Sequence, residues 1–504
     1  MGDAQYLTPT GCTYDPTPAS NHGAATRQAA DVQQLPLEIL REIFIHCLTY
    51  DRSPNHKVAP LLLCRIFSLW RSVALSTPQL WSKLSLDRIA FEADITKSMR
   101  TLTNATELWF RCVGQHCPFT YDATLPDGAT ANAAGKSLIF PLPALLRKLD
   151  LSIDDCSQLI AHGHRQTEAF VLLETARITV RSNSPLSIAL HSFPFAAAPQ
   201  LRDLALNITG DHLQTTNSLL PWAQLSQLLE RYIPLEAWHK IIRQCPLLTI
   251  CSVELDIPSP PSLPDELADA ILPCLEDLTL LFSSGPFLDA ALAHLEFPAL
   301  GSLHLACNDS LAFDLTSDTI VHIFRDAPLT SFTLRQGRTE AEELCALLAT
   351  TNTLVYLDLA CDAFFVDLFC LLCHDVEDDP IVLPWLRHLT FSIFDYGYRN
   401  ADDEGPEWYF GEDLLLELIK SRWWTGDEIT MHPTGQEMFR LQRLSLVIDE
   451  QHPTMQDEVV KMLEPLEEQG LRVDVHAGAR SEWTNGYHTG LQWKAYMDDE
   501  FEGY

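Results

Sequence analysis

The sequence predicts an α/β fold in which a short helical segment precedes a long solenoid, or horseshoe, of strand, loop and helix repeats. Three observations predict it. The chain changes at Gln34 from a polar pattern to an apolar pattern with helical spacing. A short leucine pattern then recurs at a nearly constant step. Prolines stand two places before several copies, where they end a helix and begin an extended segment.

The composition limits the classes of partner. The chain has 504 residues, of which 46% are hydrophobic, so it can bury a large core. Its 34 Lys and Arg stand against 68 Asp and Glu, which gives a formal net charge of −34. Such a surface repels the phosphates of nucleic acids and of anionic membranes. We therefore expect neither nucleic acid nor membrane as a partner, and we expect a protein partner instead.

The cysteines and the first residues indicate the compartment. Fourteen cysteines in a chain of this length are too sparse for a disulfide scaffold. The sequence begins without the basic and apolar regions of an export signal, and no stretch approaches the ~20 apolar residues that a membrane span needs. The expected location is the cytoplasm, with the nucleus as the alternative.

The amino-terminal part consists of a tail and a helical segment. Residues 1–33 contain almost no large apolar side chains, so we expect a disordered tail. Pro36 then opens an amphipathic helix, and a polar break at residues 51–57 separates it from a second apolar stretch between about Pro60 and Leu75. Residues 34–81 are therefore predicted to form two or three short helices.

The rest of the chain is predicted to be an irregular leucine-rich repeat array over residues 82–475. The pattern apolar-x-x-apolar-x-apolar starts at residues 201, 225, 250, 275, 300, 329, 354 and 386, in steps of 24 to 32 residues, and again at 441. The copy at 225 has Glu230 in its third apolar position, and earlier, less regular copies are expected at Trp81, Ala105 and Leu146. The array is regular from about residue 201. An acidic insertion is expected at about 397–438, and residues 476–504 form an acidic, aromatic tail or cap.

Two stretches near the amino terminus resemble a known family. Residues 35–44, LPLEILREIF, resemble the first helix of an F-box. Residues 62–81 contain a Trp-Arg pair and end in TPQLW, and they resemble the F-box-like domains of mushroom-forming fungi, in which leucine-rich repeats often follow. At Phe67 this chain departs from the cysteine that is frequent in the family.

The resemblance implies a function and a set of docking residues. An F-box binds the adaptor subunit of a cullin-type (SCF) ubiquitin ligase, and the domain behind it presents a client protein for ubiquitin-dependent degradation. The resemblance thus implies a substrate receptor, with no catalytic site of its own. For each adaptor-binding candidate the alternative is a place in the intramolecular core. These candidates are Leu35, Pro36, Glu38, Ile39, Ile43, Phe44, Leu63, Ile66 and Trp70.

The client surface follows from the alternation of side chains along a strand. Residues between the leucines of each copy are expected on the concave face, while the leucines enter the core. The client-binding candidates are Glu254, Asp256, Asp277, His304, Arg335, Tyr356, Asp358, His388 and Arg443. For any one of them the alternative is an ordinary solvated strand residue. The client itself remains unknown.

Other functions receive less support from the sequence. A repeat scaffold that binds a protein without a role in ubiquitin transfer is the main alternative. No phosphate-binding glycine loop, nucleophile elbow or paired-histidine zinc helix is present, so we expect no enzyme and no cofactor. Cys112, His116 and Cys117 lack a second zinc-ligand pair, and residues 370–374, CLLCH, match a haem attachment motif only in a single copy on an apolar helix.

Overall fold

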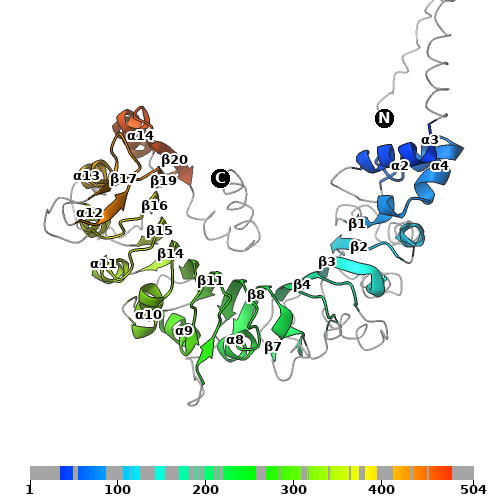
Figure 1. Cartoon of the computed structure of the whole chain (residues 1–504), viewed down its shortest axis with the longest axis horizontal. Helices are drawn as coiled ribbons and strands as arrows, with labels where there is room; N and C mark the ends of the chain where they lie inside the picture. The colour runs from blue at the N-terminus through cyan, green and yellow to red at the C-terminus, as the bar shows by residue number, and fades with distance from the viewer. Residues whose placement is uncertain are drawn as a thin grey trace, which may run out of the picture. The chain divides into compact units, whose positions relative to one another are not determined.

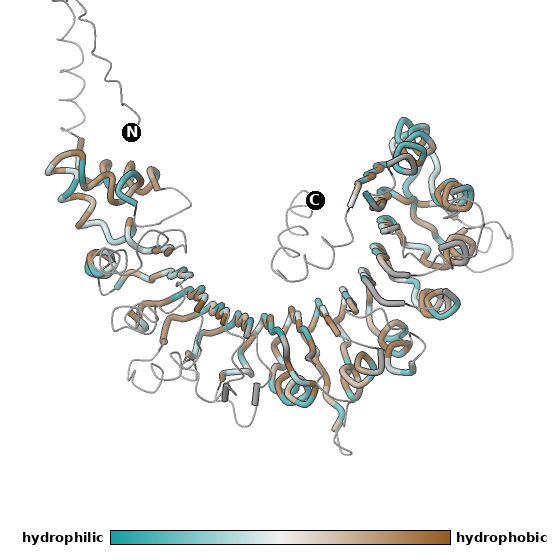
Figure 2. Tube along the Cα trace, turned by 180° about the vertical axis from the view of Figure 1, so that it is seen from behind, coloured by the Kyte–Doolittle hydropathy of each residue, from teal (hydrophilic) through white to brown (hydrophobic). Residues whose placement is uncertain are grey.

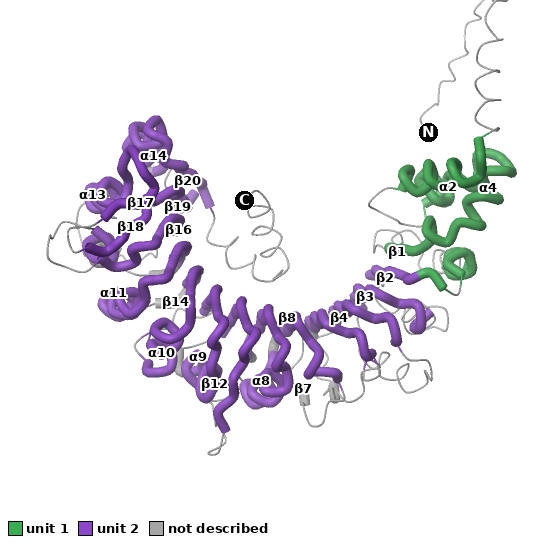
Figure 3. The backbone as a smooth tube through the Cα atoms, in the orientation of Figure 1, with its two compact units in different colours: residues 1–86, 101–117 green, residues 87–100, 118–504 purple. Residues whose placement is uncertain are grey.

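A computed structural model gives the fold. It describes residues 35–48, 55–86, 106–114, 116–124, 142–153, 170–180, 188–189, 195, 198–208, 213–214, 220–256, 268–282, 285–307, 315, 317–338, 341–362, 365–373, 381–393, 412–431, 435–450 and 453–478. The predicted amino-terminal tail and all but the first three residues of the predicted carboxy-terminal tail lie outside these ranges. Figure 3 shows two compact units, residues 1–86 with 101–117, and residues 87–100 with 118–504.

The first unit is mainly helical. Its elements are α2 (Leu37–His46), α3 (Leu63–Ile66), α4 (Ser68–Leu75), the 3₁₀ turn η1 (Pro78–Trp81) and β1 (Lys83–Leu86). Leu40 and Phe44 are one helical turn apart on α2 and are both buried, and the Phe44 ring packs edge-on against Trp70 with 4.9 Å between centroids. The second apolar stretch forms two helices, since Phe67 is extended (φ −159°, ψ 170°) and separates α3 from α4.

A pair of buried tryptophans joins a further helix to the first unit. Residues 106–113 are helical, and the indole of Trp109 donates a hydrogen bond of 2.8 Å to the Trp81 carbonyl oxygen. The indole of Trp81 in turn donates to the Ala74 carbonyl oxygen at 2.8 Å. The prediction of a strand repeat at Ala105 is therefore wrong. Trp109 and Val113 are both buried and lie four residues apart, which is the spacing of a helix face.

The second unit is α/β, with a large parallel sheet. Its strands are adjacent in nearly the order of the chain, and every neighbouring pair is parallel. In order across the sheet they are β2 (Phe119–Thr124), β3 (Leu146–Ile153), β4 (Thr175–Val180), β6 (Asp203–Ile208), β8 (Gln227–Pro234), β9 (Ile250–Asp256), β11 (Asp277–Phe282), β13 (Ser302–Cys307), β14 (Ser331–Arg338), β15 (Tyr356–Asp362), β16 (His388–Ile393), β19 (Arg443–Asp449) and β20 (Arg472–Gly478).

Helices follow the later strands and lie together on one side of the sheet (Figure 1). They alternate with the strands along the chain, which makes the unit a solenoid-like repeat. Figure 2 shows hydrophobic residues running through both the strands and the helices of this unit. The helices are α8 (Leu235–Ile242), α9 (Gly285–Leu292), α10 (Asp318–Asp326), α11 (Ala341–Ala349), α12 (Phe365–Leu372), α13 (Glu412–Arg422) and α14 (Pro453–Glu467).

Shorter elements complete the second unit. The two-stranded pairs are β5 (Ile188–Ala189) with β7 (Leu213–Gln214), β10 (Ala270–Ile271) with β12 (Leu295–Glu296), and the antiparallel β17 (Ile429–Met431) with β18 (Glu437–Phe439). The 3₁₀ turns η4 (Pro143–Leu145) and η7 (Trp222–Gln224) precede β3 and β8. Helix α13 and the β17–β18 hairpin occupy the described part of the predicted acidic insertion.

The leucines of the repeat pattern form the core. Leu278 and Leu280 on β11 lie in register with Leu303 and Leu305 on β13, and all four are buried. Burying a leucine side chain stabilises a protein by roughly 1.5–3 kcal/mol, so a stack of equivalent leucines contributes strongly to each junction between repeats. The strands at the predicted repeat starts from 201 to 441 are parallel and in register, as the pattern predicts.

Three strands of the sheet correspond to none of the repeat copies that the sequence predicts. β2 and β4 precede the regular part of the array, and β20 follows its last predicted copy. β20 continues to Gly478, beyond the boundary at residue 475 that the sequence predicts. Val473 pairs with Leu444, so the position equivalent to Leu441 is Gly470, which lacks a side chain. Its φ of 101° suits glycine. Because glycine stands here where the other copies have an apolar side chain, the leucine pattern does not predict this repeat.

Candidate interaction surfaces

The first unit presents apolar side chains to solvent. Leu37, Ile39 and Ile43 on α2, Leu62 and Ile66 at α3, and Leu75 on α4 are each 38–49% exposed, and we call these six residues the helical apolar surface. The three helices pack together, with α4 contacting both α2 and α3. Ile39 and Ile43 share a face of α2 because they are four residues apart, whereas Leu40 and Phe44 share the buried face.

The structure divides the nine adaptor-binding candidates by exposure. Pro36, Glu38, Ile39, Ile43 and Ile66 are exposed, and Leu35 and Trp70 are partly exposed. Phe44 and Leu63 are buried, so they support the surface from within. Sequence reasoning missed Leu37, Leu62 and Leu75. Leucines flanking a core position are not distinguished from core leucines by type alone, and only the packing of the helices shows which ones are left outside.

The client-binding candidates lie on the face of the sheet opposite the leucines. Six of them follow one another across β11 to β16, together with Thr333, which sequence reasoning did not single out. Thr333 is in register with His304 on one side and Asp358 on the other. We call the following seven residues the sheet-face cluster: Asp277, His304, Thr333, Arg335, Tyr356, Asp358 and His388.

An ion pair holds the centre of the sheet-face cluster. Nη2 of Arg335 donates a hydrogen bond to Oδ2 of Asp358. The Arg335 side chain is 12% exposed and the Asp358 side chain is 1% exposed. The Tyr356 hydroxyl lies 3.5 Å from the same carboxylate oxygen. The Tyr356 ring also lies 6.4 Å, centroid to centroid, from the His388 ring. These contacts make Asp358 a fixed acceptor between its neighbours.

His304 is neutral at physiological pH. Burial, together with the nearby Arg335 guanidinium, lowers the pKa of His304 to about 4, although Asp358 acts in the opposite direction. Its Nε2 lies 4.0 Å from Oδ1 of Asp277. Because the imidazole is uncharged above this pKa, the approach of His304 to Asp277 is a contact between a dipole and a charge. The cluster therefore presents a neutral imidazole and a phenol beside a neutralised ion pair.

The remaining candidates lie on either side of this cluster. Arg443 is in register with His388, and its Nε donates to Oδ2 of Asp474 at 2.7 Å. Glu254 is buried on β9, in register with Arg231 of β8. The side chain of Asp256 lies outside the described residues. The candidates thus extend across the sheet, and only those between β11 and β16 are joined by the contacts given above.

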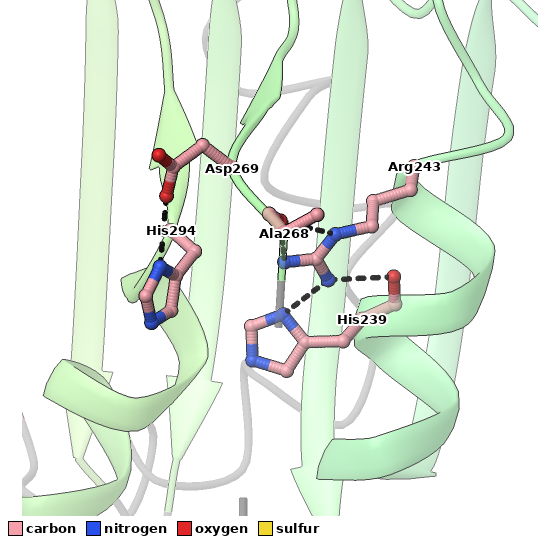
Figure 4. A network of polar contacts seen from close by, with 5 residues as sticks. All are labelled: His239, Arg243, Ala268, Asp269 and His294. Atoms are coloured by element: carbon pink, nitrogen blue, oxygen red, sulfur yellow. Dashed lines mark hydrogen bonds and ion pairs between the residues drawn. The ribbon is translucent and has the colours of Figure 1, made fainter. Parts of the chain in front are cut away.

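A separate polar network ties one loop to the helices (Figure 4). Arg243 at the end of α8 donates to the Ala268 carbonyl oxygen and lies 3.0 Å from Nδ1 of His239. The Nε2 of His239 is 2.8 Å from the Ala290 carbonyl oxygen, so Nε2 carries the hydrogen and Nδ1 accepts from Arg243. His294 Nδ1 lies 2.8 Å from Asp269. Through Ala268 and Asp269, the network fastens the segment that leads into β10 to α8 and to His294.

The described residues offer no arrangement for a metal ion. No group of three or more His, Cys, Asp or Glu among them is placed to hold one. Cys112 and Cys117 are partly buried, and burial raises the pKa of both thiols. Cys370 is exposed at the surface of α12, while His374 lies outside the described residues. The described helices also include none that is long and apolar enough to cross a membrane.

Comparison of the sequence with models of known protein families gives no match, and comparison with curated proteins gives none either.

Proposed function

We propose that this protein is the substrate receptor of a cullin-type ubiquitin ligase. In this proposal residues 34–81 are an F-box-like segment that binds the adaptor subunit, and the second unit is an irregular leucine-rich repeat horseshoe that binds a client protein. The chain supplies no catalytic group. Its role is to hold the client near the ubiquitin-transferring subunits, so both of its tasks are binding tasks.

The helical apolar surface is the observation that carries the proposal. Six leucine and isoleucine side chains remain exposed on three helices that have a well-packed core of their own. Exposed apolar groups that gather on one small unit are typical of a surface that a partner covers. A standard interface buries roughly 800 Å² on each partner, which neighbouring helix faces of this kind can supply.

The repeat architecture supports the second half of the proposal. Parallel strands with buried leucines and helices on one side are the features of a leucine-rich repeat array. Such arrays bind proteins on the face formed by the strands. On this face the sheet-face cluster offers Tyr356 and His388 partly exposed beside the Arg335–Asp358 pair, and Tyr and Arg are enriched where interfaces concentrate their binding energy.

Binding to a purified fungal adaptor subunit tests the proposal. We expect the full chain to retain the adaptor in a pull-down, and the Ile43→Asp variant to lose it, because a carboxylate would be buried without a partner in an apolar interface. Leu247→Asp is the matched control, since Leu247 is also an exposed aliphatic residue but belongs to the second unit. Circular dichroism checks that both variants keep the fold.

Two outcomes would contradict the receptor function. Failure of the unmodified chain to bind the adaptor would leave the repeat array as a protein-binding scaffold without a role in ubiquitin transfer. Equal loss of binding in the two variants would mean that the helical apolar surface is not the docking site.

A further inference from the structure

A second exposed apolar surface consists of residues on the β17–β18 hairpin and of Trp385, which precedes β16. Trp385 and Ile429 are each 45% exposed and Met431 is 61% exposed. Phe439 lies beside them and is almost fully buried. We call these four residues the hairpin patch.

The strand register makes the hairpin patch continuous. Ile429 pairs with Phe439 and Met431 pairs with Glu437, and residues directly opposite each other in an antiparallel pair share a face. Ile429 and Met431 share that face because they are two residues apart. The Phe439 ring contacts the Trp385 ring, with 5.0 Å between centroids. The patch therefore runs from Trp385 over Phe439 and Ile429 to Met431.

The hairpin is firmly attached to the repeat array. The backbone N–H of Phe439 donates to the Pro384 carbonyl oxygen at 2.8 Å, and that of Leu441, just after the hairpin, donates to the Arg422 carbonyl oxygen of α13 at 2.9 Å. The Arg387 guanidinium lies 4.3 Å from the centroid of the Phe439 ring. A surface held in this way loses little conformational entropy when a partner binds, which favours affinity.

Acidic side chains surround the patch. Asp427, Glu428 and Glu437 are exposed, and none of the three forms an ion pair with another described residue. The two arginines nearby lie against aromatic rings. Arg387 lies on Phe439, and Arg440 lies on the Trp423 ring and donates to the carbonyl oxygens of Trp424 and Gly426. The three carboxylates outnumber the two guanidinium groups, so the charge around the patch is net negative, in a chain that is strongly negative as a whole.

We propose that the hairpin patch docks a segment of a partner protein that carries large apolar side chains flanked by Lys or Arg. Trp and Met are enriched in the centres of interfaces, and the three exposed carboxylates attract basic flanks. The same carboxylates oppose the pairing of two copies of this chain through the patch, because like charges would meet at the rim. The inference goes beyond the proposed function and does not require adaptor binding.

Selection from a random peptide display library on the full chain tests the inference. We expect enriched peptides with an apolar centre and basic flanks, whose binding weakens as the salt concentration rises. Met431→Glu should weaken their binding by at least about tenfold. Ile271→Glu should leave it unchanged, and this is a matched control because Ile271 is 60% exposed and also lies in a two-stranded sheet of the second unit.

A rim variant keeps the test decisive if Met431→Glu disturbs the hairpin. Glu437→Lys should weaken peptides with basic flanks and strengthen the same peptides remade with acidic flanks. The proposal is overturned if no peptide is enriched, if the enriched peptides lack basic flanks, or if neither variant changes their binding. A dimer of the full chain in sedimentation that Met431→Glu abolishes would assign the patch to a second copy, and would also overturn it.

Discussion

Arg335 on β14 donates a hydrogen bond to the Asp358 carboxylate on β15, and the two side chains together are almost completely removed from water. They lie on the face of the sheet opposite the leucines, where side chains are usually hydrated. Taking two charges out of water is costly, and their mutual attraction offsets that cost only while both are present. The pair therefore fixes the centre of the sheet-face cluster.

We predict that Arg335→Met strongly destabilises the second unit. The substitution leaves the buried Asp358 carboxylate without its cation, which costs about 3–5 kcal/mol in comparable buried pairs. Urea denaturation followed by circular dichroism measures the change. The double variant Arg335→Met with Asp358→Leu should recover most of the loss, because no buried charge remains.

Arg443→Met is the control for this prediction. Its partner Asp474 and Arg443 itself are more exposed than the Arg335–Asp358 pair, so the loss should be about 1 kcal/mol or less. Equal losses for Arg335→Met and Arg443→Met would contradict the account of the buried pair.

A second prediction concerns Glu230, which occupies the third apolar position of its repeat. It lies in register between Leu206 and Val253, and neither of its carboxylate oxygens has a hydrogen-bond partner among the described residues. Burial raises the pKa of Glu230 from its ordinary value near 4.5 to about 8. The folded state therefore holds this proton between about pH 4.5 and 8, while the unfolded state releases it.

The stability contributed by protonated Glu230 is complete below about pH 4.5 and is lost as the pH rises toward 8. The slope is at most about 1.4 kcal/mol for each pH unit. Glu230→Leu should raise the urea midpoint at pH 7.5, and Glu230→Gln should remove this part of the pH dependence while keeping a polar side chain. A wild-type protein whose pH dependence matches that of Glu230→Gln over this range would contradict the assignment.

A third prediction concerns Arg422 at the end of α13. Its guanidinium is fully buried and donates to the carbonyl oxygens of Leu372, Val382 and Leu383, which joins α12, α13 and the segment that precedes β16. Burial lowers the pKa of Arg422 to about 10, so it remains charged at neutral pH. Lysine cannot reproduce this planar set of donors. We predict that Arg422→Lys costs about 1–3 kcal/mol for the acceptors it leaves unpaired, with faster hydrogen exchange in residues 381–386.

Some of this fold follows directly from the sequence. The leucine pattern predicts the parallel strands from residue 201 onward because each copy must bury its apolar positions against the next. The alternation of side chains then places His304, Tyr356 and Asp358 on one face without further information. Their contacts depend on the register between strands, which the repeat step also fixes.

Other features depend on packing that the sequence pattern does not contain. Gly470 conceals β20, and the residues after Ala105 match the strand pattern by chance while Trp109 and Val113 define a helix. Phe44 and Leu63 are large apolar residues like Ile39 and Ile66, yet they are buried because α2, α3 and α4 pack around them. The burial of Asp358 likewise requires Arg335 to reach it from a neighbouring strand.

Calorimetric titration of the purified adaptor subunit into the full chain measures whether the helical apolar surface docks the adaptor. We expect one-to-one binding with a Kd in the micromolar range or tighter, a loss of at least about a hundredfold for Ile43→Asp, and no change for Leu247→Asp. The absence of binding by the unmodified protein, or equal affinity of the wild type and Ile43→Asp, would contradict this expectation.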